Sequence, residues 1–102
     1  MQIDYRREEL ERLELDAGFT AGLPEGVVRA YRGRIQALRA APKEDALRPL
    51  RSFELVAEGA DGGHSLRVNE EWRLLVSFES AVQDRVTVVH DLVQRTPPET
   101  RS

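Results

Sequence analysis

Arginine and histidine are the side chains of this sequence whose types could carry out chemistry. Lys43 is the only lysine among 15 basic residues, so the positive charge is almost entirely arginine, whose planar group suits paired contacts to phosphate or carboxylate. His64 and His90 are the only histidines, and histidine moves protons readily near neutral pH. The absence of cysteine excludes disulfides, thiol nucleophiles and cysteine-based metal sites. We therefore expect neither a metal nor a cofactor.

Two amphipathic helices are predicted in the first half of the chain, ahead of most of these residues. Leucines among charged residues over 8–15 predict a short helix, which the stretch 16–18 ends. A longer helix is predicted to start at Pro24, because apolar residues then recur at three- and four-residue spacing. Those residues are Val27, Val28, Tyr31, Ile35 and Leu38. Residues 41–50 contain two prolines and are predicted to be a connector with one helical turn.

Short runs rich in β-branched or aromatic residues predict a sheet. The expected strands are an edge strand at 3–5 and further strands at 53–56, 64–69, 72–78 and 85–89. Alternation along the last three strands places even-numbered residues on an apolar face that the helices cover. The expected core positions are Leu66, Val68, Trp72, Leu74, Val76, Phe78, Val86 and Val88. The sequence therefore predicts an α+β fold, with two helices packed on one face of a small, mainly antiparallel sheet.

The odd-numbered face of this sheet is polar and is the expected functional surface. It carries Arg67, Arg73, Arg85 and Asp91. Each arginine could instead form an ion pair across strands with a carboxylate such as Glu54, Glu79 or Asp91. His64 and His90 have even numbers, which favours partly buried positions unless a bulge reverses the alternation.

One stretch carries a resemblance to a known family. Residues 63–74 read GHSLRVNEEWRL, which resembles the segment His-Ser-Ile-Arg-(Val/Ile)-Asn-Asp-Gln-Trp-Arg-(Leu/Ile) of HigB-type toxins in the RelE/ParE superfamily. The order of predicted elements from about Gln2 to Val93 is compatible with the same family. The resemblance implies a toxin domain with the RelE-like two-layer fold at residues 1–93. Residues 94–102 lie outside it, and their two prolines and lack of apolar periodicity predict a loose tail.

This resemblance implies the toxin half of a type II toxin–antitoxin system. Such a toxin is a metal-independent endoribonuclease that cleaves mRNA, often on the ribosome. A HigA-like antitoxin with a helix-turn-helix domain neutralises it, and a DNA operator is bound only through that antitoxin. The implied partners are therefore the antitoxin, mRNA and the ribosome.

The resemblance also suggests roles for particular residues. RNA is cleaved when the ribose 2′-hydroxyl attacks phosphorus, which requires proton removal, proton donation and stabilisation of the charged phosphate. Arg73 matches the phosphate-stabilising arginine of the superfamily, and Arg67 is expected on the same face. Proton transfer would fall to His64, His90 or Asp91. The further RNA contacts expected are Arg85 and Arg95.

Two features favour an alternative on the same scaffold. HigB-type toxins frequently end the last strand with Asp-Tyr-His, whereas this chain reads Val89-His90-Asp91-Leu92, and its net charge is -3 although RNA-binding proteins are usually basic. The alternative is a non-nuclease toxin or protein-binding module, with a protein target as in the ParE branch or with the antitoxin as its only partner. Open, clustered arginines favour RNA, and neutralisation of each arginine by a carboxylate favours the alternative.

A membrane role is not expected from this sequence. No apolar run approaches the length that a bilayer demands, and residues 2–9 are mainly polar where a signal peptide needs an apolar stretch. The expected location is the cytoplasm.

Overall fold

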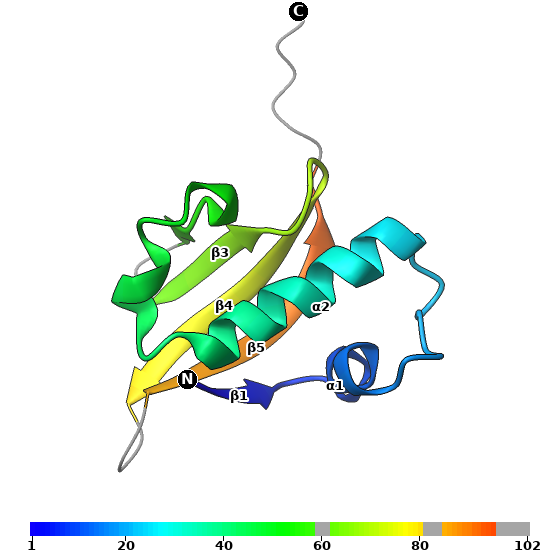
Figure 1. The fold of residues 1–102 in the computed structure, drawn as a ribbon, viewed down its shortest axis with the longest axis horizontal. Coiled ribbons are helices and arrows are strands. Elements are labelled where there is room, and N and C mark those ends of the chain that lie inside the picture. Colours follow the sequence, from blue (N-terminus) through cyan, green and yellow to red (C-terminus); the bar gives the residue numbers. More distant parts are fainter. Residues whose placement is uncertain (59–61, 81–84, 96–102) are drawn as a thin grey trace, which may run out of the picture.

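The structure is a computed structural model, and it describes residues 1–58, 62–80 and 85–95. Within these residues, two α-helices pack with a five-stranded sheet of order β1-β5-β4-β3-β2 (Figure 1). The strands are β1 (Gln2–Tyr5), β2 (Val56–Ala57), β3 (Gly63–Arg67), β4 (Trp72–Ser80) and β5 (Arg85–Gln94). Strand β1 runs parallel to β5, and the other neighbouring strands are antiparallel. This confirms the predicted α+β fold.

The two predicted helices are confirmed as α1 (Glu8–Leu15) and α2 (Glu25–Ala40). Helix α2 lies across the sheet (Figure 1), and its apolar side is buried in the core. Fully burying a side chain as large as Leu38 contributes about 2 kcal/mol to stability. Two further contacts tie α1 to α2: the Tyr31 hydroxyl donates to the Leu10 carbonyl at 2.7 Å, and Arg32 Nε donates to the Leu13 carbonyl at 2.7 Å.

The segment between α2 and β3 differs from the prediction in one respect. The helical turn expected in the connector is confirmed as the 3-10 helix η1 (Glu44–Leu47), but the strand expected at 53–56 is wrong. A second 3-10 helix, η2 (Arg51–Phe53), occupies this position, and β2 begins only at Val56. Phe53 is buried in the core, so tertiary packing overrides the strand preference of its aromatic side chain.

The faces predicted for the first half of β5 are also wrong. Cross-strand partners lie on the same face of a sheet, and Val89 pairs with Val76, which belongs to the core beneath α2. Val89 and Thr87 therefore face the helices, whereas Val86 and Val88 lie on the other face. The run from 86 to 89 contains only β-branched residues, so it offers no polar–apolar alternation from which the faces could be read.

A β-bulge then changes the alternation within β5. Leu75 pairs with Asp91 and Val76 pairs with Val89, which leaves His90 as an extra residue between them. An extra residue turns the following side chains to the opposite face from the one that simple alternation assigns. Strand β5 continues through the bulge to Gln94, so the first residue of the expected tail belongs to the sheet. Residues 96–102 of that tail lie outside the described residues.

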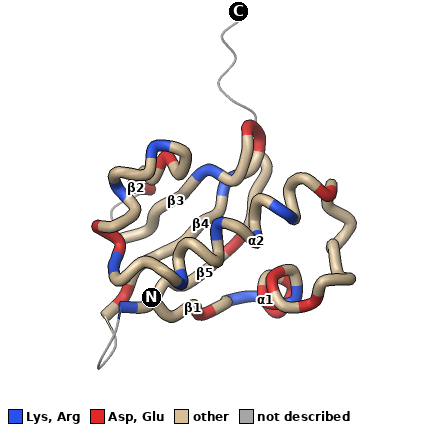
Figure 2. Tube along the Cα trace, in the orientation of Figure 1, with Lys and Arg blue, Asp and Glu red and all other residues tan. Residues whose placement is uncertain are grey.

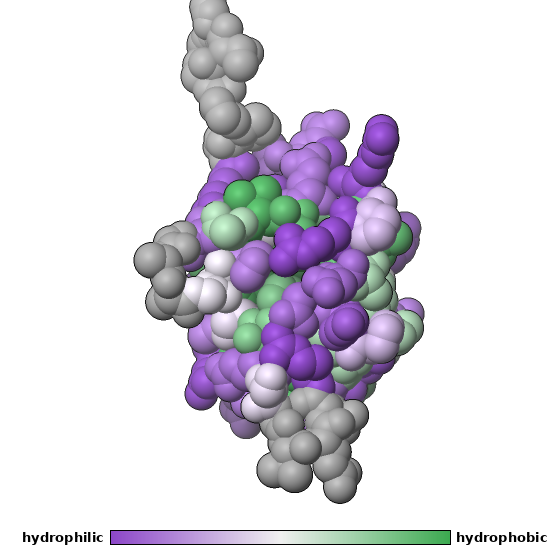
Figure 3. All heavy atoms as spheres, turned by 90° about the vertical axis from the view of Figure 1, so that its left-hand side faces the viewer, coloured by the Kyte–Doolittle hydropathy of each residue, from purple (hydrophilic) through white to green (hydrophobic). Residues whose placement is uncertain are grey.

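Acidic and basic residues are interspersed along the described part of the chain (Figure 2). The large hydrophobic side chains that are most exposed are Leu15, Leu50 and Val56. Figure 3 shows hydrophobic patches separated by hydrophilic side chains on one side of the molecule. Over residues 1–58, 62–80 and 85–95, no helix has the length and apolar character needed to cross a membrane.

Candidate functional site

The outer face of the sheet, which carries Ser65, Arg67, Arg73, Leu75 and Ser77, lies opposite the helix-covered face. Arg67 on β3 and Arg73 on β4 are direct cross-strand partners, an arrangement that is unfavourable for two like charges alone. The carboxylate of Glu54, from the turn after η2, lies between them. Arg67 Nη1 donates to Glu54 Oε2 at 3.0 Å, and Arg73 Nη1 donates to Glu54 Oε1 at 3.5 Å.

Arg73 is held mainly by the protein itself. Its Nε donates to Ser65 Oγ at 2.8 Å, and its Nη2 donates to the backbone carbonyls of Ser65 and Glu54. Only 17% of the side chain is exposed. Arg73 therefore fixes the Glu54 turn against β3, in addition to supplying positive charge to the outer face.

Arg67 is more accessible, and a third arginine lies beside it. The Arg67 side chain is 36% exposed. Arg34 of α2 donates from Nε to the Arg67 carbonyl at 2.7 Å and from Nη2 to the Ser52 carbonyl at 3.2 Å. Burial, together with the nearby charge of Arg67, lowers the pKa of Arg34.

We call Arg34, Arg67, Arg73 and Glu54 the arginine cluster. Within the described residues, Glu54 is the carboxylate that forms ion pairs with the arginines of this cluster. It bridges Arg67 and Arg73, which are two of the three guanidinium groups. Arg34 forms no ion pair with any residue that the structure describes, because it donates to the backbone carbonyls of Arg67 and Ser52. The cluster therefore has an excess of positive charge, on a chain whose net charge is -3.

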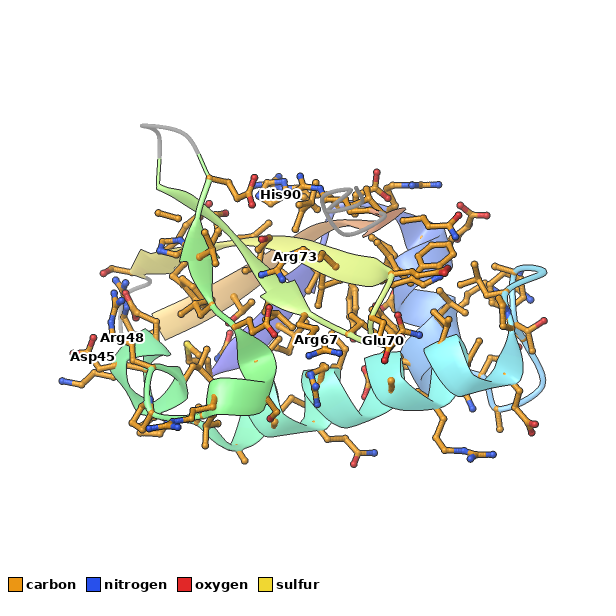
Figure 4. All side chains as sticks on the ribbon, turned by 90° about the horizontal axis from the view of Figure 1, so that it is seen from above. Asp45, Arg48, Arg67, Glu70, Arg73 and His90 are labelled. Atoms are coloured by element: carbon orange, nitrogen blue, oxygen red, sulfur yellow. The ribbon has the colours of Figure 1, made fainter. Side chains whose placement is uncertain are left out.

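His90 lies on the same outer face, because the bulge turns its imidazole toward Ser77. The distance between His90 Nε2 and Ser77 Oγ is 2.8 Å, and His90 is exposed. Ser77 is the diagonal neighbour of Ser65, at a typical Cα separation of about 7–8 Å. Figure 4 shows His90 on the side of the sheet away from α2, with Arg73 between His90 and Arg67. The buried position favoured by simple alternation is wrong for His90.

His64 lies on the helix-covered face, apart from the arginine cluster. It pairs with Val76 in a regular part of the β3–β4 register, so no bulge turns it outward. Its ring packs edge-on against Phe78 with centroids 5.2 Å apart, and its Nδ1 lies 3.0 Å from the Gly62 carbonyl oxygen. The partly buried position expected for His64 is confirmed, and this residue is not placed with Arg73.

Asp91 and Arg85 form ion pairs outside the arginine cluster. Asp91 lies on the outer face, as expected, because it is the cross-strand partner of Leu75. Asp91 Oδ1 accepts a hydrogen bond from Arg7 Nη1 at 2.6 Å, at the start of α1. Arg85 forms an ion pair with Glu44 of η1. The prediction that Arg85 shares a face with Arg67 is therefore wrong, because the faces of this part of β5 are exchanged.

Arg95 reaches the outer face through a carboxylate. Arg95 Nη1 donates to Glu58 Oε2 at 3.0 Å, and the same oxygen accepts a hydrogen bond from Ser65 Oγ at 2.8 Å. The hydrogen bonds from Arg95 and Ser65 hold the pKa of Glu58 below its usual range. A continuous set of polar contacts thus joins Arg95, through Glu58 and Ser65, to Arg73.

Arg34 and the two serines of the outer face, Ser65 and Ser77, were not among the functional residues expected from the sequence. Arg34 lies three residues after Tyr31 and four before Leu38, so it borders the apolar side of α2 that faces the sheet. Ser65 and Ser77 occupy odd positions on the expected polar face. These positions could have pointed to the three residues, but a position alone does not show which side chain or carbonyl each residue contacts.

No protein-family model matches this chain, and no curated protein matches it. Within the described residues, no group of three or more His, Cys, Asp or Glu side chains could hold a metal ion. Function must therefore be inferred from the geometry of the outer face, together with the resemblance of residues 63–74.

Proposed function

We propose that this chain is the toxin of a type II toxin–antitoxin system and cleaves mRNA on the ribosome without a metal. The observation that carries the proposal is that one sheet face combines an arginine cluster with excess positive charge and an exposed histidine. Arginine binds phosphate oxygens in pairs, and histidine transfers protons near neutral pH. Both functions are needed to cleave RNA through its 2′-hydroxyl.

In the proposed reaction, His90 removes the proton from the ribose 2′-hydroxyl. The 2′-oxygen then forms a bond to phosphorus, and the bond from phosphorus to the 5′-oxygen breaks. The leaving 5′-oxygen takes a proton from the imidazolium of His90 or from water. Positioned proton transfer of this kind typically accelerates a reaction by about 10²–10⁴-fold.

The arginine cluster supplies the positive charge that the phosphate requires. Arg67 is the more exposed of the two cross-strand arginines and contacts the phosphate directly. Arg73 adds charge and positions Ser65 and the Glu54 turn through its three backbone and hydroxyl contacts. Ser77 holds the imidazole of His90 in place.

The same proposal names the partners. A HigA-like antitoxin neutralises the toxin by covering the outer face or by keeping it from the ribosome. Operator DNA is bound only through that antitoxin, and the proposed place of action is the cytoplasm.

The test is induced expression of the wild type, Arg67→Ala and His90→Ala, with growth measured and new RNA 5′ ends mapped. Arg29→Ala is the matched control, because Arg29 is an arginine of α2 that is 78% exposed and lies outside the cluster. We expect growth arrest and new 5′ ends with the wild type and the control. Both should be lost in Arg67→Ala and His90→Ala while circular dichroism shows that these variants fold. Cleavage that persists in both variants would contradict the proposed site.

The carboxylate partners of the arginines favour a second candidate function. Arg67 and Arg73 share Glu54, Arg85 pairs with Glu44, and Arg95 pairs with Glu58. Such neutralisation suits a protein-binding module or a toxin with a protein target better than it suits an RNA-binding surface. Growth arrest without new RNA 5′ ends would favour this second function.

A further inference from the structure

Glu54 has an unusual backbone conformation at the centre of the arginine cluster. Its φ of 44° and ψ of 56° lie in the left-handed region, which a residue other than glycine adopts rarely and keeps when its surroundings hold it there. Two contacts hold Glu54: its N–H donates to the Arg51 carbonyl at 3.1 Å, and its own carbonyl accepts from Arg73 Nη2. The turn therefore delivers the Glu54 carboxylate to the space between Arg67 and Arg73.

The two carboxylate oxygens of Glu54 bind as two phosphate oxygens would. Oε2 accepts from Arg67 and Oε1 accepts from Arg73, so one anion bridges two guanidinium groups. Charged hydrogen bonds from arginine form equally with carboxylate and phosphate oxygens. The position of the Glu54 carboxylate thus marks where an external anion would bind.

An external anion can reach this position. The Glu54 side chain is 50% exposed, and an ion pair with that exposure contributes little to stability. The contacts that fix the turn involve the backbone of Glu54, so its side chain can rotate into solvent while the turn stays in place. Arg34 remains beside Arg67 and keeps the vacated position positively charged.

We infer that the Glu54 carboxylate occupies the phosphate-binding position of the arginine cluster, and that a phosphodiester of single-stranded RNA displaces it on binding. This inference rests on the proposed function. It adds that a side chain of the protein itself, Glu54, blocks the RNA-binding site in the free protein. Glu54 then weakens RNA binding in the wild type and limits the activity of the free toxin.

The test compares Glu54→Gln with Glu79→Gln. Glutamine keeps the shape of the side chain and removes its charge. Glu79 is a close control, because it is 55% exposed and its ion pair with Arg6, at 3.9 Å, lies outside the cluster. Both variants change the net charge of the chain equally. The probe is a short single-stranded RNA with 2′-O-methyl groups, which cannot be cleaved through its 2′-oxygens.

Removing the competing charge should tighten binding of this RNA by roughly fivefold in Glu54→Gln, since one unit charge at about 4 Å in water has an effect of this size. The slope of log affinity against log salt should also become steeper, because the displaced carboxylate of the wild type attracts a counterion and the glutamine of the variant does not. Glu79→Gln should change both quantities much less. Equal changes in the two variants, or weaker binding by Glu54→Gln, would overturn the inference.

A second measurement separates this inference from the proposed function. Inorganic phosphate is titrated into wild type and Glu54→Gln at constant ionic strength, and the NMR signals of Arg67 and Arg73 are followed. Tighter phosphate binding by Glu54→Gln without any RNA cleavage by the wild type would support the phosphate position and overturn the nuclease. Cleavage that depends on His90, with no gain in phosphate or RNA binding by Glu54→Gln, would support the nuclease and overturn the role of Glu54.

Discussion

Two arginine–glutamate contacts in this protein differ in exposure and in charge balance. In the first, which we call the helix clasp, Glu14 of α1 accepts hydrogen bonds from Arg39 of α2 at 2.7 Å and from Tyr5 of β1. The Glu14 side chain is 10% exposed and forms an ion pair with one arginine. In the arginine cluster, Glu54 is 50% exposed and bridges two arginines.

The two contacts differ in how far the carboxylate neutralises the arginines around it. Burial raises the pKa of Glu14, but the hydrogen bonds from Arg39 and Tyr5 outweigh this effect and hold that pKa below its usual range. Burial and the neighbouring Glu14 also raise the pKa of Tyr5. The helix clasp satisfies its own charges and joins three elements, whereas the arginine cluster keeps unsatisfied positive charge at the surface. The helix clasp therefore serves stability, and the excess charge of the arginine cluster supports the ligand binding that we propose for it.

The largest expected difference between the two contacts appears when the arginine of each is replaced and RNA cleavage is measured. Arg73→Ala should reduce RNA cleavage by about 100-fold or more, because both the preorganised positive charge near the phosphate and the contacts that position Ser65 and the Glu54 turn are lost. Arg39→Ala should leave cleavage within about twofold, since the helix clasp contains no proposed substrate contact. The measurement is the cleavage rate of purified protein at a temperature where both variants are folded. Equal losses of cleavage in the two variants would break the comparison.

A smaller effect is expected on stability. Glu14→Ala leaves the Tyr5 hydroxyl and the Arg39 guanidinium without their shared acceptor, which should cost about 1–3 kcal/mol of unfolding free energy. Glu54→Gln should change the unfolding free energy by less than about 1 kcal/mol, because its ion pairs are exposed. Urea denaturation of both variants measures these differences. A larger loss in Glu54→Gln than in Glu14→Ala would reverse the assigned roles.

The helix clasp should also make stability depend on pH in the acid range. The folded-state pKa of Glu14 is below the ordinary value of 4.5, so its contribution is present above about pH 4.5 and is lost as the pH falls through the folded-state pKa. We expect the urea midpoint of the wild type to fall more steeply between pH 5 and about pH 3 than that of Glu14→Gln. Parallel pH profiles would show that Glu14 does not bind its partners as described.

The smallest effect is expected from the hydroxyl that contacts His90. Ser77→Ala removes one hydrogen bond to the imidazole, which is worth about 1 kcal/mol, so cleavage should fall roughly fivefold. The measurement is the cleavage rate of the purified, folded variant. Ser80→Ala, at the end of β4, is the control and should leave the rate unchanged. An unchanged rate in Ser77→Ala would mean that Ser77 has no part in positioning His90.

Much of the fold follows from local patterns in the sequence. Apolar spacing identified α1 and α2, and β-branched runs located β3, β4 and β5. The prediction of a strand at 53–56 was wrong because Phe53 is buried in the core from a 3-10 helix. The strand preference of its side chain does not reveal this packing. Arg85 was assigned to the wrong face because four consecutive β-branched residues follow it and hide the alternation.

By itself, the sequence determined the chemical groups and the strands that carry them. It placed Arg67 and Arg73 on one polar face, because side chains alternate with a fixed period along a regular strand. Only the tertiary structure decided that His90 joins this face, since a single extra residue in β5 reverses the alternation without leaving a compositional mark. It also brought Arg34 and Glu54 to the same place, through contacts between residues that are 33 and 19 positions apart in the chain. Such contacts depend on how α2 and the η2 turn pack against the sheet, which local periodicity does not encode.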